Sequence, residues 1–151
     1  MTVTFFGHRN IFQNIKPILE KTIRNLIENE KADLFYVGSN GDFDEYVAST
    51  LERVKSEYPH IRCYIVLAYM PSKQNSLYGK KMKLDTIFPE DVAISIPRFA
   101  ISKRNDWMLR KSDIVVTYIS HPFGCAEKYH QKAIKKGKKV INLAEIKELQ
   151  L

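Results

Sequence analysis

Long apolar runs are absent from this sequence, and no stretch approaches the roughly 20 residues that a membrane-spanning helix requires. The first residues also lack the charged region and the long apolar stretch of a secretory signal peptide. We therefore expect a cytoplasmic protein that has no membrane partner.

Cysteine is scarce as well, with only Cys63 and Cys125 in the chain of 151 residues. The two cysteines lie in unlike contexts without the spacing of a metal site, and a reducing compartment would keep both as thiols. The complete GxGxxG fingerprint of dinucleotide-binding proteins is also missing, which disfavours NAD as a ligand. The sequence therefore indicates no disulfide, no metal site and no cofactor.

Internal repeats, linkers and low-complexity tracts are likewise missing. A chain of 151 residues with 44% hydrophobic and 27% charged residues fits one globular domain around one core. We therefore expect residues 1–151 to form a single domain.

Basic residues outnumber acidic ones, and the formal net charge is +7. Such a charge attracts phosphate-bearing ligands or nucleic acid without choosing between them. Helical spacing would spread much of the excess over one solvated face, so simple solvation is the alternative to a binding role. The lysines concerned are Lys128, Lys132, Lys135, Lys136, Lys138 and Lys139.

Apolar residues follow strand and helix periods in alternation along the chain. The expected strands cover residues 2–6, 34–37, 61–68, 113–118 and 139–143, and the expected helices cover residues 11–29, 43–58, 98–110 and 123–136. This order predicts an α/β fold with a Rossmann-like, mostly parallel five-stranded sheet in the order 3-2-1-4-5 and helices on both faces. Residues 70–97 break the pattern around several prolines, and we expect an irregular lid or interface segment there.

The expected topology also predicts where a ligand binds. In an open parallel sheet, ligands bind beyond the carboxyl ends of the strands, at the point where strand order reverses. In the expected order, that point lies between the first and fourth strands, which are followed by the loops Gly7-His8-Arg9-Asn10 and residues 120–125. The sequence therefore predicts one ligand crevice between these two loops.

The first loop combines three residue types that suit an anionic ligand. Gly7 permits close approach to the backbone, and His8 provides a titratable imidazole. Arg9 can bind two oxygens of a phosphate or carboxylate through its planar guanidinium.

A second turn, Gly38-Ser39-Asn40-Gly41, supplies further flexible backbone and side-chain donors. Among the acidic residues that follow it, Asp44 is a candidate for hydrogen bonds to sugar hydroxyls. Capping of the next helix is the competing explanation for Asp42.

The helix expected from residue 123 offers an anion site at its start. Gly124 opens this helix, so free backbone N–H groups would face the crevice. Glu127 in the first turn can reach the same cavity, or it can simply complement the helix dipole. Cys125, with His121 nearby, is a candidate thiolate, and the alternative is a small residue at a tight helix start.

Three aromatic residues lie near the expected crevice, and one of them could stack against a base. They are Phe12, Tyr69 and Phe123.

Taken together, these residues resemble the SLOG superfamily of Rossmann-like nucleotide binders, which includes the LOG-type phosphoribohydrolases, the DNA-processing DprA proteins and the YpsA-like group. The likeness covers nearly the whole chain. Residues 3–9 look like the YpsA-like start, and residues 104–108 and 111–116 look like the late helix and strand of that group.

Parts of the catalytic segments of LOG-type enzymes are also recognisable. Arg104 and Met108 match the spacing of an R-K-x-x-M segment, while Pro122, Gly124 and Glu127 match parts of a P-G-G-x-G-T-x-E-E segment. The resemblance implies that Glu127 and Arg104 are the catalytic pair. The chain departs from the pattern by placing Phe123 at a glycine, Cys125 at the threonine and Lys128 at the second glutamate.

The departures favour a nucleotide-binding sensor or binding module over an enzyme. Hydrolysis of an N-glycosidic bond through Glu127 is the alternative, and nucleic-acid binding through the lysine-rich last helix is a second one. A homodimer or higher homo-oligomer is the expected assembly, because symmetric homo-oligomers are the commonest.

Overall fold

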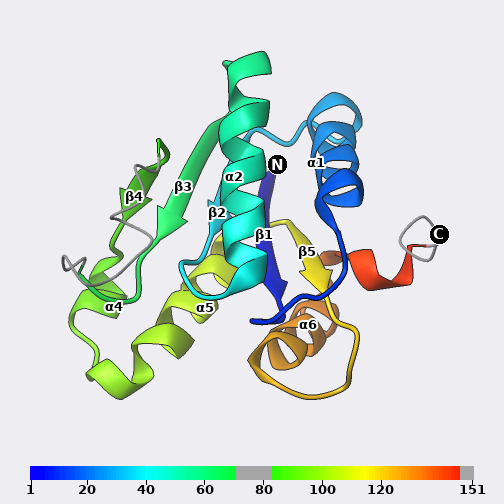
Figure 1. Ribbon diagram of the computed structural model, residues 1–151. Coiled ribbons are helices and arrows are strands. Elements are labelled where there is room, and N and C mark those ends of the chain that lie inside the picture. Colours follow the sequence, from blue (N-terminus) through cyan, green and yellow to red (C-terminus); the bar gives the residue numbers. More distant parts are fainter. Residues whose placement is uncertain (71–82, 147–151) are drawn as a thin grey trace.

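The computed structural model describes residues 1–70 and 83–146, which form one α/β domain (Figure 1). Its sheet has six parallel strands in the order β4-β3-β2-β1-β5-β6. The strands are β1 (Thr2–Gly7), β2 (Leu34–Val37), β3 (Arg62–Val66), β4 (Asp85–Ile87), β5 (Ile114–Tyr118) and β6 (Lys139–Asn142). The helices are α1 (Lys16–Asn29), α2 (Asp42–Glu57), α4 (Glu90–Ala93), α5 (Ala100–Lys111) and α6 (Cys125–Lys135), with the short 3-10 turns η1 (Pro97–Phe99) and η2 (Leu143–Glu145).

Helices cover both faces of the sheet because the central strands carry apolar residues on both sides. Phe5 packs into the cluster formed by α1 and α2, whereas its neighbour Phe6 packs against Tyr129 of α6 and Met108 of α5. Successive side chains of a strand point to opposite faces, so β1 is buried on both. β1 and β5 therefore form a rigid centre for the loops that follow them.

The predicted fold is confirmed, with one strand more than expected. The five predicted strands occur in the predicted order, and β4 adds a sixth at the outer edge beside β3. This strand lies inside the segment predicted to be irregular, as does α4. Residues 71–82 of that segment lie outside the described residues, and its role as lid or interface stays a prediction.

Three helices begin later than their apolar spacing suggested. α1 starts at Lys16 rather than at residue 11, because the backbone N–H of Ile11 donates to Asp42 Oδ2 at 2.9 Å instead of joining a helix. Ile11 and Ile15 are nevertheless buried, which explains the misleading spacing. α5 starts at Ala100 after the turn η1, and α6 starts at Cys125.

Within the described parts of the chain, no helix is both long and apolar enough to cross a bilayer.

Candidate functional site

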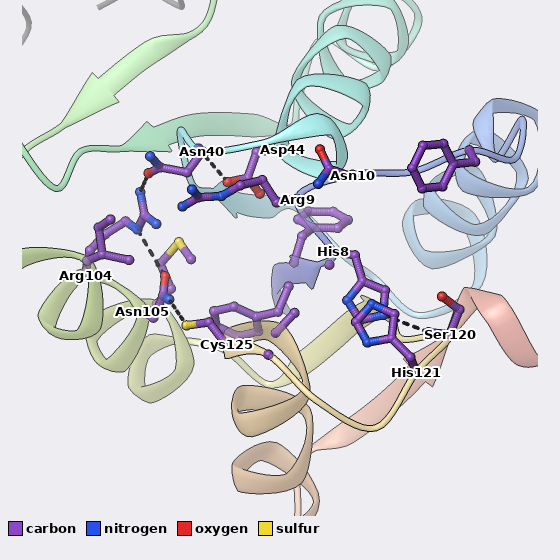
Figure 2. Close-up of a pocket in the computed structure, with 18 residues that line it drawn as sticks. His8, Arg9, Asn10, Asn40, Asp44, Arg104, Asn105, Ser120, His121 and Cys125 are labelled. Carbon is purple, nitrogen blue, oxygen red and sulfur yellow. Dashed lines mark hydrogen bonds between the residues drawn. The ribbon is translucent and has the colours of Figure 1, made fainter.

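A cavity of about 540 Å³ opens beyond the carboxyl ends of β1 and β5 (Figure 2). The connection after β1 leads towards β2 on one side, whereas the connection after β5 leads towards β6 on the other. This divergence leaves a crevice between the two loops. Its lining comes from the loop after β1, the turn before α2, one face of α5, and residues 120–121 and 124–126. The crevice therefore lies where the sequence predicted it.

Two glycines allow the loops around the cavity to interlock. A Cβ atom at Gly7 would overlap the Phe43 ring, so only glycine lets the end of β1 pack beneath α2. Gly41 has a φ angle of 92°, in the left-handed region that favours glycine. Just after it, the backbone N–H of Asp42 donates to the carbonyl of Arg9 at 2.7 Å. Together these contacts fix the position of Arg9 at the rim.

Asp42 does not cap its helix, contrary to the competing explanation for this residue. The N-cap position of α2 is Gly41, which makes no side-chain capping bond. Asp42 instead accepts the N–H of Ile11 and so holds the loop between β1 and α1.

Arg104 forms a buried cross-link between α5 and the turn before α2. It is only 3% exposed. Its Nε donates to Asn105 Oδ1 at 3.1 Å, and its Nη1 donates to Ser39 Oγ at 3.2 Å and to Asn40 Oδ1 at 3.0 Å. Its guanidinium is therefore largely occupied by protein acceptors, which suits a residue that shapes the wall of the cavity.

Asp44 is a carboxyl group held close to this cross-link. Its Oδ2 accepts the backbone N–H of Asn40 at 2.9 Å. Removal from water raises the pKa of Asp44 to about 6, although the nearby Arg104 guanidinium and the Asn40 N–H both favour the charged form. Near neutral pH this group can accept a hydrogen bond from a ligand hydroxyl, and at mildly acidic pH it can donate one.

Arg9 differs from Arg104 in that its guanidinium makes no hydrogen bond with the described residues. Its side chain points into the crevice beside Asp44 (Figure 2), and the residue is exposed. Its guanidinium has no hydrogen bond or ion pair within residues 1–70 and 83–146. A planar cation with unfilled donors in a cavity is suited to bind phosphate or carboxylate oxygens.

His8 fastens the loop after β5 to the end of β1. Its Nε2 accepts the backbone N–H of Ser120 at 2.9 Å, so the neutral ring must carry its proton on Nδ1. The ring also stacks on His121 with centroids 3.6 Å apart, and Phe123 stacks on the other side of His121 at 4.1 Å. Burial and then the neighbouring His121 lower the pKa of His8, which keeps the ring neutral.

The start of α6 forms the lower rim of the cavity. Gly124, with a φ angle of 104°, is the N-cap residue, and Cys125 begins the helix. Cys125 is exposed, and its Sγ accepts a hydrogen bond from Asn105 Nδ2 at 3.7 Å. Glu127 lies in the first turn, where its Oε1 accepts from Gln131 Nε2 at 2.9 Å.

The structure brings most of the predicted residues together, but five lie outside the cavity lining. Those in the lining are Gly7, His8, Arg9, Asn40, Asp44, Arg104, Gly124 and Cys125. Those outside it are Gly38, Ser39, Gly41, Phe123 and Glu127. Glu127 is half-buried in the first turn of α6, and its proposed catalytic role stays a prediction.

Two lining residues of α5, Ile101 and Asn105, had not been identified from the sequence. Their spacing of four places them on one helical face, together with Met108, and this was the available signal. Within the described residues, no group of three or more His, Cys, Asp or Glu side chains is placed to hold a metal ion.

A family model described as the YspA SLOG family matches residues 2–149. Among solved structures, the fold is similar to that of DNA processing protein A (DprA) from Streptococcus pneumoniae, with a TM-score of 0.63 and 16% sequence identity. The match covers 92% of this chain and 48% of DprA, so the chain spans about half the length of that protein. At this identity the likeness concerns the fold alone. No curated protein sequence matches the chain.

Proposed function

Because the chain belongs to the YspA SLOG family, as its sequence motifs indicated, we propose that it binds a nucleotide or nucleotide derivative in the crevice between the loops after β1 and β5. In this proposal it acts as a sensor or binding module. The observation that carries the proposal is the exposed Arg9 guanidinium, which points into a cavity of about 540 Å³ and makes no hydrogen bond or ion pair with the described residues.

A phosphate fits the part of the cavity between Arg9 and the start of α6. Gly124, Cys125 and Ala126 line it, and the first N–H groups of a helix have no acceptors within that helix. A phosphate there would receive both the guanidinium and the helix N–H donors. Because Arg104 already binds three protein acceptors, it supports this arrangement by fixing the wall rather than by holding the phosphate.

A sugar fits beside the phosphate, where hydrogen-bond acceptors and donors for hydroxyl groups are concentrated. The Asp44 carboxyl accepts hydrogen bonds from hydroxyl groups in its ionised form, and Asn10 and Asn40 offer amide groups to the same cavity. The neutral His8 ring keeps its Nδ1–H available as a further donor.

Binding without turnover is favoured over N-glycosidic hydrolysis by the position of Glu127. Its carboxylate is hydrogen-bonded to Gln131 and does not line the cavity. Hydrolysis through Glu127 is the alternative, because the Glu127 charge acts on His8 of the cavity wall and raises the pKa of that ring against burial and His121. Loss of nucleotide hydrolysis on Glu127→Gln, with binding retained, would support the enzyme instead.

Nucleic-acid binding remains a second candidate because lysines gather on and after α6. Lys128, Lys135 and Lys136 are exposed. DprA, a solved protein with a similar fold, is a DNA processing protein. This candidate requires an affinity for DNA or RNA that falls steeply as salt is raised, and absence of binding at low salt would remove it.

The proposal is tested by native mass spectrometry of the protein purified from cells, followed by identification of any small molecule released on denaturation. We expect a bound nucleotide in the wild type and its loss in Arg9→Gln. Arg62→Gln is the matched control, because it removes the same charge from an exposed arginine at the amino end of β3, far from the carboxyl edge of the sheet. A nucleotide retained equally by Arg9→Gln would overturn the assignment of the site, and failure to bind any added nucleotide would overturn the function.

A further inference from the structure

A second cavity, of about 450 Å³, adjoins the first one above the end of β5. It is lined by residues 10–13 of the loop before α1, by residues 118–120 at the end of β5, and by Ala144 of η2. Asn10, Phe12 and Ser120 line both cavities. The two cavities therefore adjoin each other at these three residues, and they are called the first and second compartments below.

The chemistry of the two compartments differs. The first contains Arg9, Asp44 and Arg104, whereas the second has no Asp, Glu, Lys, Arg or His among its described lining residues. The polar groups of the second compartment are neutral amides and hydroxyls. Such a surface accommodates an uncharged ring with hydrogen-bonding groups. It offers no cationic side chain to balance the negative charge of a phosphate.

Gln13 keeps donors available in this second compartment. The Tyr118 hydroxyl donates to Gln13 Oε1 at 2.8 Å, which holds the side-chain amide in one orientation. No described residue accepts a hydrogen bond from Gln13 Nε2. The orientation is thus fixed by the protein while the amide N–H groups remain free for a ligand.

Phe12 stands at the junction of the compartments with its ring in solvent. It is 97% exposed, whereas the preceding Ile11 is only 6% exposed. The N–H of Ile11 is held by Asp42, so the loop turns Ile11 inwards and leaves Phe12 on the surface. A flat ring that enters the second compartment would find an aromatic face there, and aromatic faces stack on nucleobases.

From these observations we propose that the second cavity is a subsite for an uncharged ring group attached to the phosphate of the ligand. The inference rests on the proposed function and extends it to a ligand class, in which a phosphate or diphosphate at Arg9 carries a ring group on each side. One nucleoside occupies the first compartment. The second ring lies over Phe12 and bonds to Gln13.

Calorimetric titration with paired probes tests this subsite. The probes are AMP against diadenosine 5′,5′-diphosphate, and GMP against diguanosine 5′,5′-diphosphate. We expect the two-ring probe of at least one pair to bind about tenfold more tightly than its monophosphate, since stacking of one base on an aromatic side chain is worth roughly that much or more. Phe12→Ala should remove most of this preference, because the two-ring probe should lose more affinity than the monophosphate.

Phe123→Ala is the matched control, because Phe123 is also an exposed phenylalanine at the mouth but lines neither cavity. It should keep the preference. Equal binding of both members of each pair would overturn the subsite and leave the proposed function standing. Absence of binding for all four probes would overturn both, and loss of the preference in Phe123→Ala as well as in Phe12→Ala would show that the second cavity is not its source.

Discussion

The two walls of the crevice are built in opposite ways. On the wall formed by α5 and the turn before α2, Arg104, Asn40 and Asp44 belong to one hydrogen-bonded network that leaves Arg104 buried. On the wall formed by the loops after β1 and β5, Arg9 and Phe12 are exposed and have few protein partners. The first wall contributes to the stability and shape of the domain, and the second keeps its contacts free for a ligand.

This difference implies that substitutions in the two walls should have separable effects. Changes in the α5 wall should alter the free energy of unfolding as well as binding. Changes at the exposed side chains of the loop wall, Arg9 and Phe12, should alter binding alone, since removal of an exposed side chain without hydrogen bonds affects stability by less than about 0.5 kcal/mol.

The largest effect is expected for Arg104→Met. The substitution leaves the acceptors of Asn105, Ser39 and Asn40 without their charged donor, and the loss of hydrogen bonds to a charged group costs about 3 kcal/mol of unfolding free energy. Urea unfolding measures the loss. Lys103→Met is the control at the neighbouring exposed position and should change little. A loss similar to that of the control would show that the network contributes nothing to stability.

Arg9→Gln tests the wall formed by the loops after β1 and β5. A hydrogen bond to a charged group is worth about 1.5 to 3 kcal/mol, so we expect nucleotide affinity to fall by about tenfold or more. The urea midpoint should stay within the error of the wild-type value. A clear loss of stability would mean that Arg9 belongs to the structural wall, and the distinction between the walls would then fail.

Asp44→Asn should stabilise the domain at pH 7.5. The pKa of Asp44 is raised from 3.8 to about 6, so the folded protein binds the proton more tightly and ionisation above pH 6 opposes folding. The amide avoids this penalty and should increase the unfolding free energy by about 1 kcal/mol or more. The gain should shrink as the pH falls towards 4 in a series of urea titrations. Greater stability of the wild type at pH 7.5 would contradict this explanation.

The smallest effect concerns His8 and the loop after β5. Since burial lowers the pKa of His8 below 6.5, the unfolded chain binds more protons between that lowered value and 6.5. The stabilisation by His8 is therefore present above pH 6.5 and is lost as the pH falls through the folded-state pKa. Protonation would also remove the acceptor of the Ser120 N–H.

The measurement for His8 is the difference in unfolding free energy between the wild type and His8→Gln at pH 7.5 and at pH 5. We expect this difference to be smaller at pH 5. His60→Gln, at an exposed position outside the crevice, is the control and should show no such change. A difference that grows on acidification would contradict the neutral state of His8.

The position of the crevice could be predicted because it depends on strong local signals. β1 and β5 are short runs of buried residues followed by loops, and their adjacency follows from the order of elements. β4 could not be predicted in this way. Asp85 and Thr86 are exposed, so this edge strand has no apolar pattern and depends on its pairing with β3.

The roles of the charged residues were harder to predict than their positions. Arg104 lines the crevice, and its predicted catalytic role stays a prediction. Its acceptors Ser39 and Asn40 are 65 and 64 residues away in the chain, and no local pattern indicates these contacts. For Glu127, the sequence indicates the first turn of α6 correctly. It does not determine the side-chain direction, which depends on the contact with Gln131.

The central claim is that the crevice binds a nucleotide through its phosphate at Arg9. The most direct test is calorimetric titration of the wild type, Arg9→Gln and Arg62→Gln with AMP and GMP and with the corresponding nucleosides. We expect a monophosphate to bind the wild type and Arg62→Gln about tenfold or more tightly than its nucleoside, and this preference to disappear in Arg9→Gln. Equal binding of nucleoside and nucleotide by the wild type, or an unchanged preference in Arg9→Gln, would contradict the claim.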